Sequence, residues 1–451
     1  MLSLIMATAT LLAQASPSPA PAASPTEKPE RWSIHAQVTN TLQSHPGFPA
    51  AYTGPQSLFP ARDIEKSFDF TSFFGGRLWK GAEFYIDHEF DQGFGLGNPN
   101  PSGPYNGLLG AAGFYSNEAT KVGATHPYGR LTRYFIRQTF DFGGDRQTLQ
   151  PDQNQLGETT TAENLILTFG KFSVVDVFDT NPYAHDSKND FLNWSIVDMG
   201  SFDYAADAWG YSRGLSAELT RGDSTLRAGI FQLSLVPNST QLEKSGFRQF
   251  SPIVEFERRT SFLGGHPGTF KALAFGDYGY FGTYDDAVAA AAGTGAPPDL
   301  SLVRTSKHWK LGGGLNIAQE ITPHVGLFTR LSAMNGVYEE DDWAVIDRSI
   351  SGGVSLGGDL WRRPNDAIGV ALARNAISTS AQRYFAAGGL ENTMGDGGLS
   401  YANERIFEAY YRLGITKGMA MTGDYQRVVN PGYNAVRGPV SVFGLRYHAQ
   451  L

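Results

Sequence analysis

Apolar and polar residues alternate along sixteen segments of the chain, as they do in β-strands that have one apolar and one polar face. In residues 32–40, for example, Ile34 and Val38 alternate with Ser33 and Gln37. We therefore expect an all-β protein. The predicted strands are 32–40, 68–79, 82–90, 131–142, 163–172, 209–221, 224–234, 250–260, 268–281, 306–319, 323–335, 347–358, 367–374, 404–414, 417–426 and 438–451.

The connections between these segments differ in length in a regular way. Long connections such as 41–67 and 173–208 follow odd-numbered segments, while most even-numbered segments are followed by short turns such as 80–81. The stretch 143–162 is the one clear exception. A soluble sandwich or propeller has no reason to sort its connections in this way. Short turns at one end and long loops at the other predict a 16-stranded antiparallel transmembrane β-barrel with short periplasmic turns and long extracellular loops.

The last segment, 438–451, is two-faced to the end of the sequence. Phe443, Leu445 and Tyr447 alternate with Arg446 and His448. An open sheet edge is not stable in hydrocarbon, because its backbone N–H and C=O groups lack partners there. We therefore predict that this segment closes the barrel against the first strand.

Composition agrees with this prediction and excludes several classes of protein. Hydrophobic residues make up 41% of the chain and the mean hydropathy is −0.26, values that are also found in soluble proteins. Hydropathy does not reveal transmembrane barrels, because half of the residues in each strand are polar. Outside the N-terminus no apolar run approaches the ~18 residues of a membrane helix. The absence of cysteine excludes thiol chemistry and disulfides, and the net charge of −8 argues against nucleic-acid binding.

The N-terminal region reads as an export segment and a linker. Residues 1–15 have an apolar core and end in the small-x-small sequence Ala13-Gln14-Ala15, which is typical of a signal peptide cleavage site. Residues 16–31 are rich in Pro, Ala and Ser, which favours a flexible leader. Residues 32–451 then form the barrel domain.

Charged residues on the polar faces of the strands are candidates for a pore constriction. A lumen in which carboxylates face guanidinium groups offers many donors and acceptors to a neutral polyhydroxyl solute. Alternatively, these residues form ion pairs that stiffen the wall without contacting solute. The candidates are Arg77, Glu83, Asp87, Glu89, Arg133, Arg137, Glu404, Glu408, Arg412 and Asp424.

The connection 173–208 is the most unusual one, because it combines many Asp and Asn residues with aromatic ones. We predict that it folds into the barrel and narrows it, with Trp194, Phe191 and Tyr183 under a sugar ring and Asp186 and Asn193 bound to its hydroxyls. A calcium site and a plain extracellular loop with Asx turns are the alternatives. The D-x-[DN]-x-[DN]-G spacing of calcium loops is absent, so we expect no metal.

Catalytic motifs are missing from the sequence. It contains no HExxH pair, no GxSxG and no Walker loop. A barrel hydrolase with a Ser–His pair remains an alternative, because the spacing of its catalytic residues is not a local motif. We expect a protein that is not an enzyme and that has no cofactor.

Five stretches of sequence resemble the carbohydrate-selective porin family of Gram-negative outer membranes. The more specific part is GKF…D.FD.N.YA.D…FLN in residues 170–193. The resemblance implies a sixteen-stranded barrel that passes glucose and related sugars by facilitated diffusion, with arginine and glutamate in its narrow part. The final Leu451 departs from the aromatic residue with which such barrels usually end. The stretches are 79–96, 131–145, 167–195, 202–219 and 424–451.

Together these observations predict a channel for neutral carbohydrates in the outer membrane of a Gram-negative bacterium. The expected partners are small neutral sugars, outer-membrane lipid and lipopolysaccharide, with no nucleic acid, and the chain is expected to be a monomer or a homotrimer. A general or ion-selective porin of the same fold is the alternative function, followed by a barrel that acts as an enzyme or an adhesin.

Overall fold

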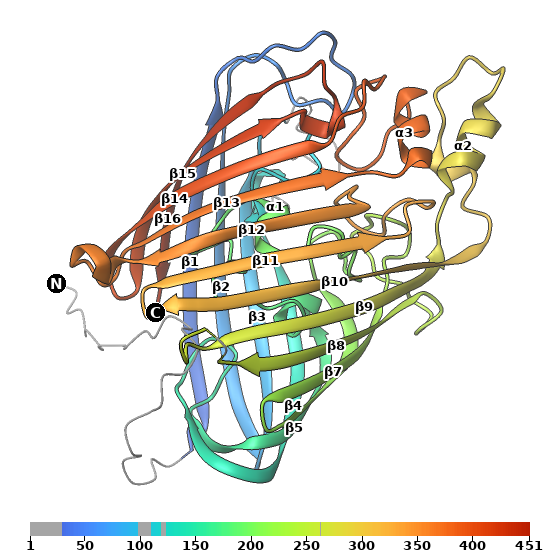
Figure 1. The fold of residues 1–451 in the computed structure, drawn as a ribbon. Coiled ribbons are helices and arrows are strands. Elements are labelled where there is room, and N and C mark those ends of the chain that lie inside the picture. Colours follow the sequence, from blue (N-terminus) through green and yellow to red (C-terminus); the bar gives the residue numbers. More distant parts are fainter. Residues whose placement is uncertain (1–28, 98–109, 119–122, 262) are drawn as a thin grey trace.

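A closed barrel of sixteen antiparallel strands forms the body of this computed structural model, which describes residues 29–97, 110–118, 123–261 and 263–451 (Figure 1). The strands are β1 (Trp32–His45), β2 (Asp63–Trp79), β3 (Ala82–Gly93), β4 (Ala124–Leu149), β5 (Glu158–Phe172), β6 (Ser212–Arg221), β7 (Ser224–Gln232), β8 (Phe250–Thr260), β9 (Gly268–Tyr280), β10 (Lys307–Thr322), β11 (Val325–Met334), β12 (Arg348–Gly357), β13 (Ala367–Ala376), β14 (Glu404–Thr416), β15 (Met419–Val429) and β16 (Val440–Gln450). Each strand pairs with its neighbours in sequence, and β16 pairs with β1. The predicted fold class is confirmed.

The seam between the first and last strands lies where the sequence predicted it. β16 pairs with β1 over eight positions, from Gln37 opposite Gln450 to Ser44 opposite Phe443. The backbone of Leu451 adds two more hydrogen bonds, both to Ala36. The sheet is therefore closed along this seam, and its backbone groups are paired as the interior of a membrane requires.

The helices of the described residues are short and lie in the connections. They are α1 (Trp194–Val197), α2 (Tyr284–Ala291), α3 (Thr379–Ala386) and the 3-10 turns η2 (Val174–Asp176), η3 (Leu300–Leu302), η4 (Gly358–Trp361) and η5 (Pro431–Tyr433). None of the helices in these parts of the chain is long and apolar enough to cross a membrane. α2 and α3 pack together at one end of the barrel, where Arg383 pairs with Asp285 (Figure 1).

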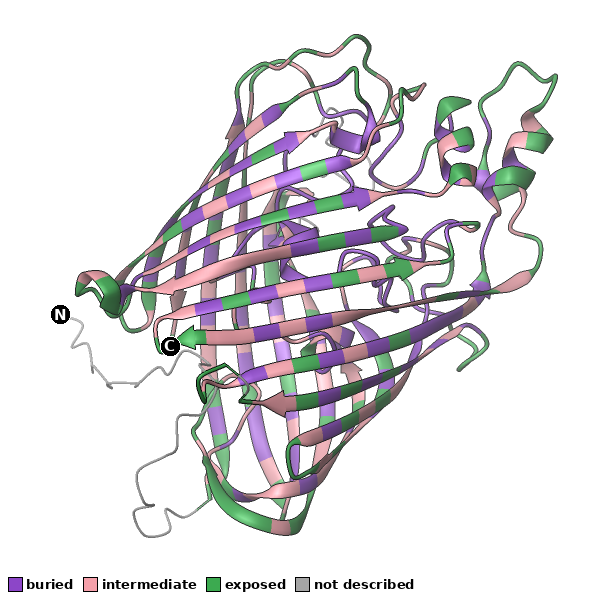
Figure 2. Ribbon diagram, in the orientation of Figure 1, coloured by how far each residue is buried: buried purple, intermediate pink, exposed green. Residues whose placement is uncertain are grey.

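The two faces of the strands differ in accessibility, and Figure 2 shows the alternation as bands along each strand. On β1, the outward-facing Ile34 is 66% exposed, whereas Thr39 and Thr41 face the lumen and are buried. An apolar side chain on the outer face is suited to hydrocarbon, and a polar one on the inner face meets other polar groups. The burial of the inner face also indicates that the lumen is partly filled by protein.

The two ends of the barrel carry connections of different length. Long loops follow odd-numbered strands, and the C-terminus lies at the opposite end, with the short turns (Figure 1). The apparent exception at 143–162 disappears, because β4 runs to Leu149 and β5 begins at Glu158. The predicted signal peptide and most of the predicted leader lie outside the described residues.

Candidate functional site: the constriction

The connection between β5 and β6, residues 173–211, folds into the barrel and crosses it. Arg330 on β11 donates to the carboxylate of Asp179 over 3.0 Å. Arg446 on β16 donates to the carbonyl oxygen of Asp190 over 2.8 Å. Both guanidinium side chains are almost completely buried. The loop is thus fixed to strands that lie far apart around the barrel, and the prediction that it narrows the lumen is confirmed.

Short polar residues give this loop its local shape. Ser173 and Asp176 cap η2, and the side chain of Asn193 caps α1 by accepting from the backbone N–H of Ser195 over 3.2 Å. Asp179 has a φ of 56° and accepts from the N–H of Met199 over 2.6 Å. Asn and Asp tolerate such turns because their side chains bond the nearby backbone. The dense Asp and Asn pattern of the sequence is therefore used for turns and caps.

The side-chain oxygens of this loop would also have to serve as ligands in the alternative calcium site. Asp186 accepts from the N–H of Lys188 and from the side chain of Asn189, each in a local turn. Within the described ranges, no group of three or more histidine, cysteine, aspartate or glutamate side chains could hold a metal ion. The geometry of this loop is that of Asx turns.

Two glutamates on β14 hold segments of chain inside the barrel. Glu404 accepts from the backbone N–H groups of Ala112 and Gly113 over 3.0 and 2.7 Å. Glu408 accepts from the N–H groups of Leu192 and Asn193. A carboxylate that accepts two backbone N–H groups makes strong hydrogen bonds and leaves few lone pairs for a solute. These two candidates therefore anchor the inward-folded segments.

A second element enters the lumen from the side of the short turns. We call residues 150–157, between β4 and β5, the periplasmic tongue. Asn154 donates to the carboxylate of Asp87 over 2.8 Å, and Arg137 donates to the carbonyl oxygen of Asn154 over 2.8 Å. Gln153 donates to the side chain of Gln37 on β1 over 3.1 Å. The tongue therefore borders the lumen, and in the sequence only the exceptional length of the connection 143–162 marked this region.

The base of the tongue is fixed by the end of the predicted leader. Glu30 and Gly157 exchange two hydrogen bonds, of 2.9 and 2.8 Å. Arg77 lies beside them and pairs with Glu158 at 2.7 Å and with Glu83 at 3.0 Å. Residue 30, near the end of the predicted leader 16–31, is thus held against the barrel by these bonds.

The loop, the tongue and the wall enclose a cavity of about 840 Å³ in the lumen. Its lining mixes guanidinium and ammonium groups with carboxylates, and several aromatic faces reach it. Its charged lining residues are Glu89, Glu118, Arg133, Arg137, Asp152, Asp176, Asp186, Lys188, Asp198, Glu257 and Lys271. Its aromatic lining residues are Phe73, Phe135, Phe172, Trp194, Tyr204, Trp209, Tyr211 and Trp343, and His185 also reaches it.

Arg133 joins the wall to the loop at the edge of this cavity. Its Nε and Nη2 atoms donate to the two carboxylate oxygens of Asp176 over 2.7 and 2.6 Å, which is a two-pronged ion pair. Its third nitrogen lies 3.5 Å from Asp87. The guanidinium also lies 4.9 Å from the ring centroid of Tyr211. Such a pair has a fixed orientation, because the planar guanidinium matches the carboxylate.

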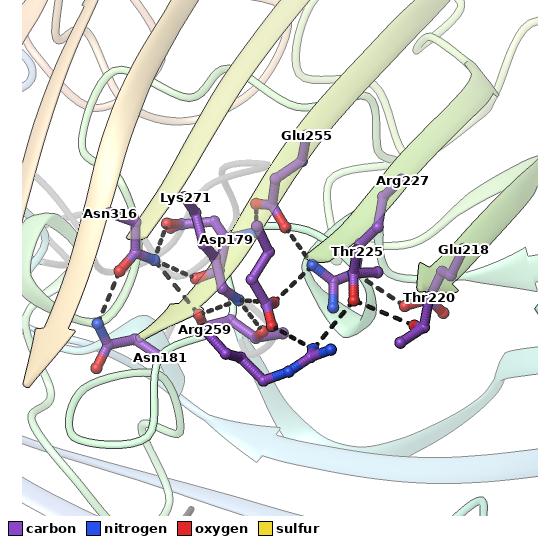
Figure 3. Close-up of polar contacts among 12 residues, drawn as sticks. Asp179, Asn181, Glu218, Thr220, Thr225, Arg227, Glu255, Arg259, Lys271 and Asn316 are labelled. Carbon is purple, nitrogen blue, oxygen red and sulfur yellow. Dashed lines mark hydrogen bonds and ion pairs between the residues drawn. The ribbon is translucent and has the colours of Figure 1, made fainter. Parts of the chain in front are cut away.

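Opposite-charge networks continue around the wall of β6 to β9, as Figure 3 shows. Arg227 lies between Glu218 and Glu255 and donates to each over 2.8 Å. Lys271 on β9 donates to the carbonyl oxygen of Thr180 over 2.6 Å, and the N–H of Asp179 donates to Glu255 over 2.8 Å. The loop is therefore bonded to this wall as well as to β11 and β16.

Three aromatic residues of the lining pack against one another on the loop side of the cavity, and each is only 2–4% exposed. The ring centroid of Trp194 lies 5.7 Å from that of Tyr204 and 5.6 Å from that of Trp343. Phe191 was predicted to lie under a bound sugar together with Trp194. It packs instead against Phe328 and Tyr410 and is fully buried. Its side chain fills the space between loop and wall, because that face of the loop points to β11 and β14.

The structure brings together some of the predicted site residues and separates others. The predicted residues that line the cavity are Glu89, Arg133, Arg137, Asp186 and Trp194. The predicted residues that do not line the cavity, and that bond to other protein groups, are Arg77, Glu83, Asp87, Asn193, Glu404, Glu408 and Asp424. Arg412 lies near the short-turn end, where it donates to the carbonyl oxygen of Asn365 over 2.9 Å.

Seven of the eleven charged lining residues were not among the predicted site residues: Glu118, Asp152, Asp176, Lys188, Asp198, Glu257 and Lys271. Lys271 stands on a predicted strand and shares a face with Asp277, so the alternation alone could have found it. Asp176 and Lys188 lie in the loop, where no periodicity indicates which side chain faces the lumen. Lys188 pairs with Asp69 on β2 at 2.7 Å and so also fastens the loop to the wall.

Two solved structures have a similar fold. The structure is similar to a high-pH structure of OprB from Pseudomonas putida, with a TM-score of 0.69, 17% identity, and 93% of this chain and 94% of that chain covered. A low-pH structure of the same protein gives a TM-score of 0.50 and 12% identity, with 93% of each chain covered. Comparison with curated protein sequences gave no significant match.

The family comparison covers most of the sequence. The model of the carbohydrate-selective porin family, OprB, matches residues 63–451, which extend from the start of β2 to the end of the chain. The match agrees with the closed barrel and with a location in the Gram-negative outer membrane. The chain belongs to the carbohydrate-selective porin family, OprB.

Proposed function

We propose that this porin passes small neutral sugars by facilitated diffusion, and that the cavity between loop and wall is where they bind. The observation that carries the proposal is the composition of the cavity lining, in which carboxylates and cations lie beside aromatic side chains. A sugar has hydroxyl groups around its rim and C–H groups on its faces. A lining of this kind offers partners for both.

Paired charges in the lining would bind ions less strongly than unpaired ones, although its seven carboxylates outnumber its four cations. Arg133 has its partner in Asp176, and Lys188 has one in Asp69. The fields of close opposite charges largely cancel beyond a few ångströms, so an ion that enters gains little and loses hydration. A neutral solute loses less, and its hydroxyls can exchange water for carboxylate and guanidinium partners.

Single-channel current in a planar bilayer tests the proposal directly. The current is measured while glucose, maltose, succinate or lysine is added in turn. We expect saturable block by glucose or maltose and weak block by the two charged solutes. Stable conductance without sugar block would overturn the carbohydrate assignment and favour a general or ion-selective porin.

Two matched variants locate the site. Arg133→Gln removes the two-pronged pair inside the lumen, whereas Arg213→Gln removes a guanidinium that lies on the exposed outer face and donates to Tyr134 over 2.9 Å. We expect weaker sugar block in Arg133→Gln and unchanged block in Arg213→Gln. Equal sugar block in the wild type and in Arg133→Gln would exclude this guanidinium from the binding site.

A further inference from the structure

Four arginines form a row on the outer face of the barrel at the end that carries the long loops. They are Arg348 on β12, Arg374 on β13, Arg405 on β14 and Arg427 on β15. All four are exposed and alternate with buried, lumen-facing residues on their strands. Each lies within three residues of the loop end of its strand. The row therefore lies at one height on four adjacent strands.

Strand register brings like charges together within this row. Arg374 and Arg405 stand directly opposite each other on β13 and β14. Like charges in directly opposed positions destabilise a sheet. None of the four forms an ion pair with a carboxylate of the described residues, in contrast to the lumen arginines Arg133 and Arg330. No carboxylate of the described residues thus lies within ion-pair distance of this row.

The polar contacts that the row does make are neutral. Arg427 donates to the hydroxyl of Ser441 over 3.1 Å. The side-chain oxygen of Asn403, with its amide turned to face the guanidinium, lies 2.9 Å from Arg374. A hydroxyl and an amide orient a guanidinium without neutralising it. The four charges therefore remain available to an external anion.

An apolar belt lies directly below the row, toward the middle of the barrel. Outward-facing Ile350, Leu372 and Phe443 are 48, 62 and 51% exposed. On the same four strands and β16, the surface thus changes from cationic to apolar within about two residues, or roughly 7 Å at the rise of a strand. This is the profile of a membrane interface, with charged side chains at the headgroups and apolar ones at the acyl chains.

We propose that the row Arg348, Arg374, Arg405 and Arg427 binds the phosphorylated headgroup of a glycolipid of the outer leaflet, while its acyl chains lie against the belt below. Guanidinium groups bind phosphate in a two-pronged manner, and several on adjacent strands match a headgroup with more than one phosphate. A second copy related by a two-fold axis through the row does not fit it, because such a contact would bring the same cationic surface to it. The position at the loop end selects the outer leaflet, since long loops are extracellular.

Lipid binding to the folded protein in detergent tests the proposal, with a bisphosphorylated lipid A as the probe and its dephosphorylated form as the matched control. We expect saturable binding of the phosphorylated form, weakened by salt, and binding of the dephosphorylated form that is weaker by at least roughly tenfold. Equal affinity of the two forms for the wild type would overturn the proposal without any mutation.

Variants then assign the site. Arg374→Gln/Arg405→Gln should weaken binding of the phosphorylated form by about tenfold or more, since two charge-assisted contacts are lost. The control Arg258→Gln removes an exposed guanidinium at the short-turn end, where it pairs with Asp223 at 3.5 Å, and should leave binding unchanged. Folding of each variant is checked by heat-modifiable mobility in gels. Unchanged binding in the folded double variant would place the phosphate elsewhere and overturn the assignment.

The two ligand classes are distinguishable. A failure of sugar block in planar bilayers leaves the lipid result untouched, because the arginine row lies on the outer face and the cavity lies in the lumen.

Discussion

Arg330 on β11 and Asp179 in the inward loop form an ion pair of 3.0 Å in which the two side chains are 1% and 0% exposed. The other nitrogens of Arg330 donate to the backbone carbonyl oxygens of Ile196 and Ala184 over 2.9 and 2.8 Å. A buried guanidinium with its charge paired and its donors used holds three points of the loop at once. The position of the loop in the lumen depends on this residue more than on any surface contact.

Replacing Arg330 by methionine should therefore loosen the loop. The variant leaves the carboxylate of Asp179 buried without its cation, and we expect a loss of about 3–5 kcal/mol of unfolding free energy. The urea midpoint of the detergent-folded protein measures this loss. Single-channel records should also become noisier, because the loop samples more positions.

The control for this prediction is Arg330→Met combined with Asp179→Asn, which removes both charges. We expect part of the stability to return, since no unpaired charge remains. A single variant as stable as the wild type would show that the pair does not hold the loop.

Variants of Asn154 test whether the periplasmic tongue narrows the lumen. Asn154→Gly keeps the positive φ of 54° but removes the hydrogen bond to Asp87. Asn154→Ala removes the same bond and adds a strain of about 1–2 kcal/mol, because an alanine disfavours this conformation. We expect a higher conductance in both variants and a larger increase in Asn154→Ala.

The matched control for the tongue is Asp223→Ala, in the turn between β6 and β7. Its side chain is exposed and its turn lies at the same end of the barrel. Its conductance should equal that of the wild type. If Asn154→Ala also conducts like the wild type, the tongue does not limit the current.

The local stability of the long loop 335–347 should depend on pH, because carboxyl groups are buried in it and beside it. Burial raises the pKa of Asp341 to about 8, and the neighbouring Asp203 raises it further while Lys310 opposes the rise. Burial also raises the pKa of Glu391, which faces this loop, to about 7. In the unfolded chain both groups have a pKa of about 4.

These pKa values determine how the stability of the loop changes with pH. The folded loop binds more protons than the unfolded one, so its stability is fully present below about pH 4 and is lost as the pH rises through 7 to 8. Amide hydrogen exchange in residues 335–347, corrected for intrinsic rates, should be faster at pH 8.5 than at pH 5. Asp341→Asn should reduce the difference. Equal corrected rates at the two pH values would contradict the prediction.

Arg133→Lys separates the charge of Arg133 from its shape. Lysine keeps the positive charge but cannot make the two-pronged contact with Asp176. We expect unchanged ion selectivity, measured as reversal potential in a salt gradient, together with sugar block weakened several-fold. Sugar block as strong as in the wild type would show that the charge suffices and that the two-pronged contact is not needed.

Alternation in the sequence was sufficient to predict the barrel, and the predicted strand 250–260 coincides with β8. It was also sufficient to put Glu404 and Glu408 on the inner face, where both are buried. It could not tell whether an inner residue meets water or another segment. That distinction depends on where the loop lies, which is decided by long-range bonds such as Glu408 to Leu192. The tongue was missed because the ends of β4 and β5 lack regular alternation.

The anchoring of the loop on several sides has a consequence for the time course of the current. Contacts from β9, β11 and β16 would all have to break before the loop could leave the lumen. An event that needs several buried bonds to break together is rare on the timescale of milliseconds. Under steady voltage the open channel should therefore carry long, uninterrupted currents, and brief interruptions should report the passage of solutes and not movement of the protein.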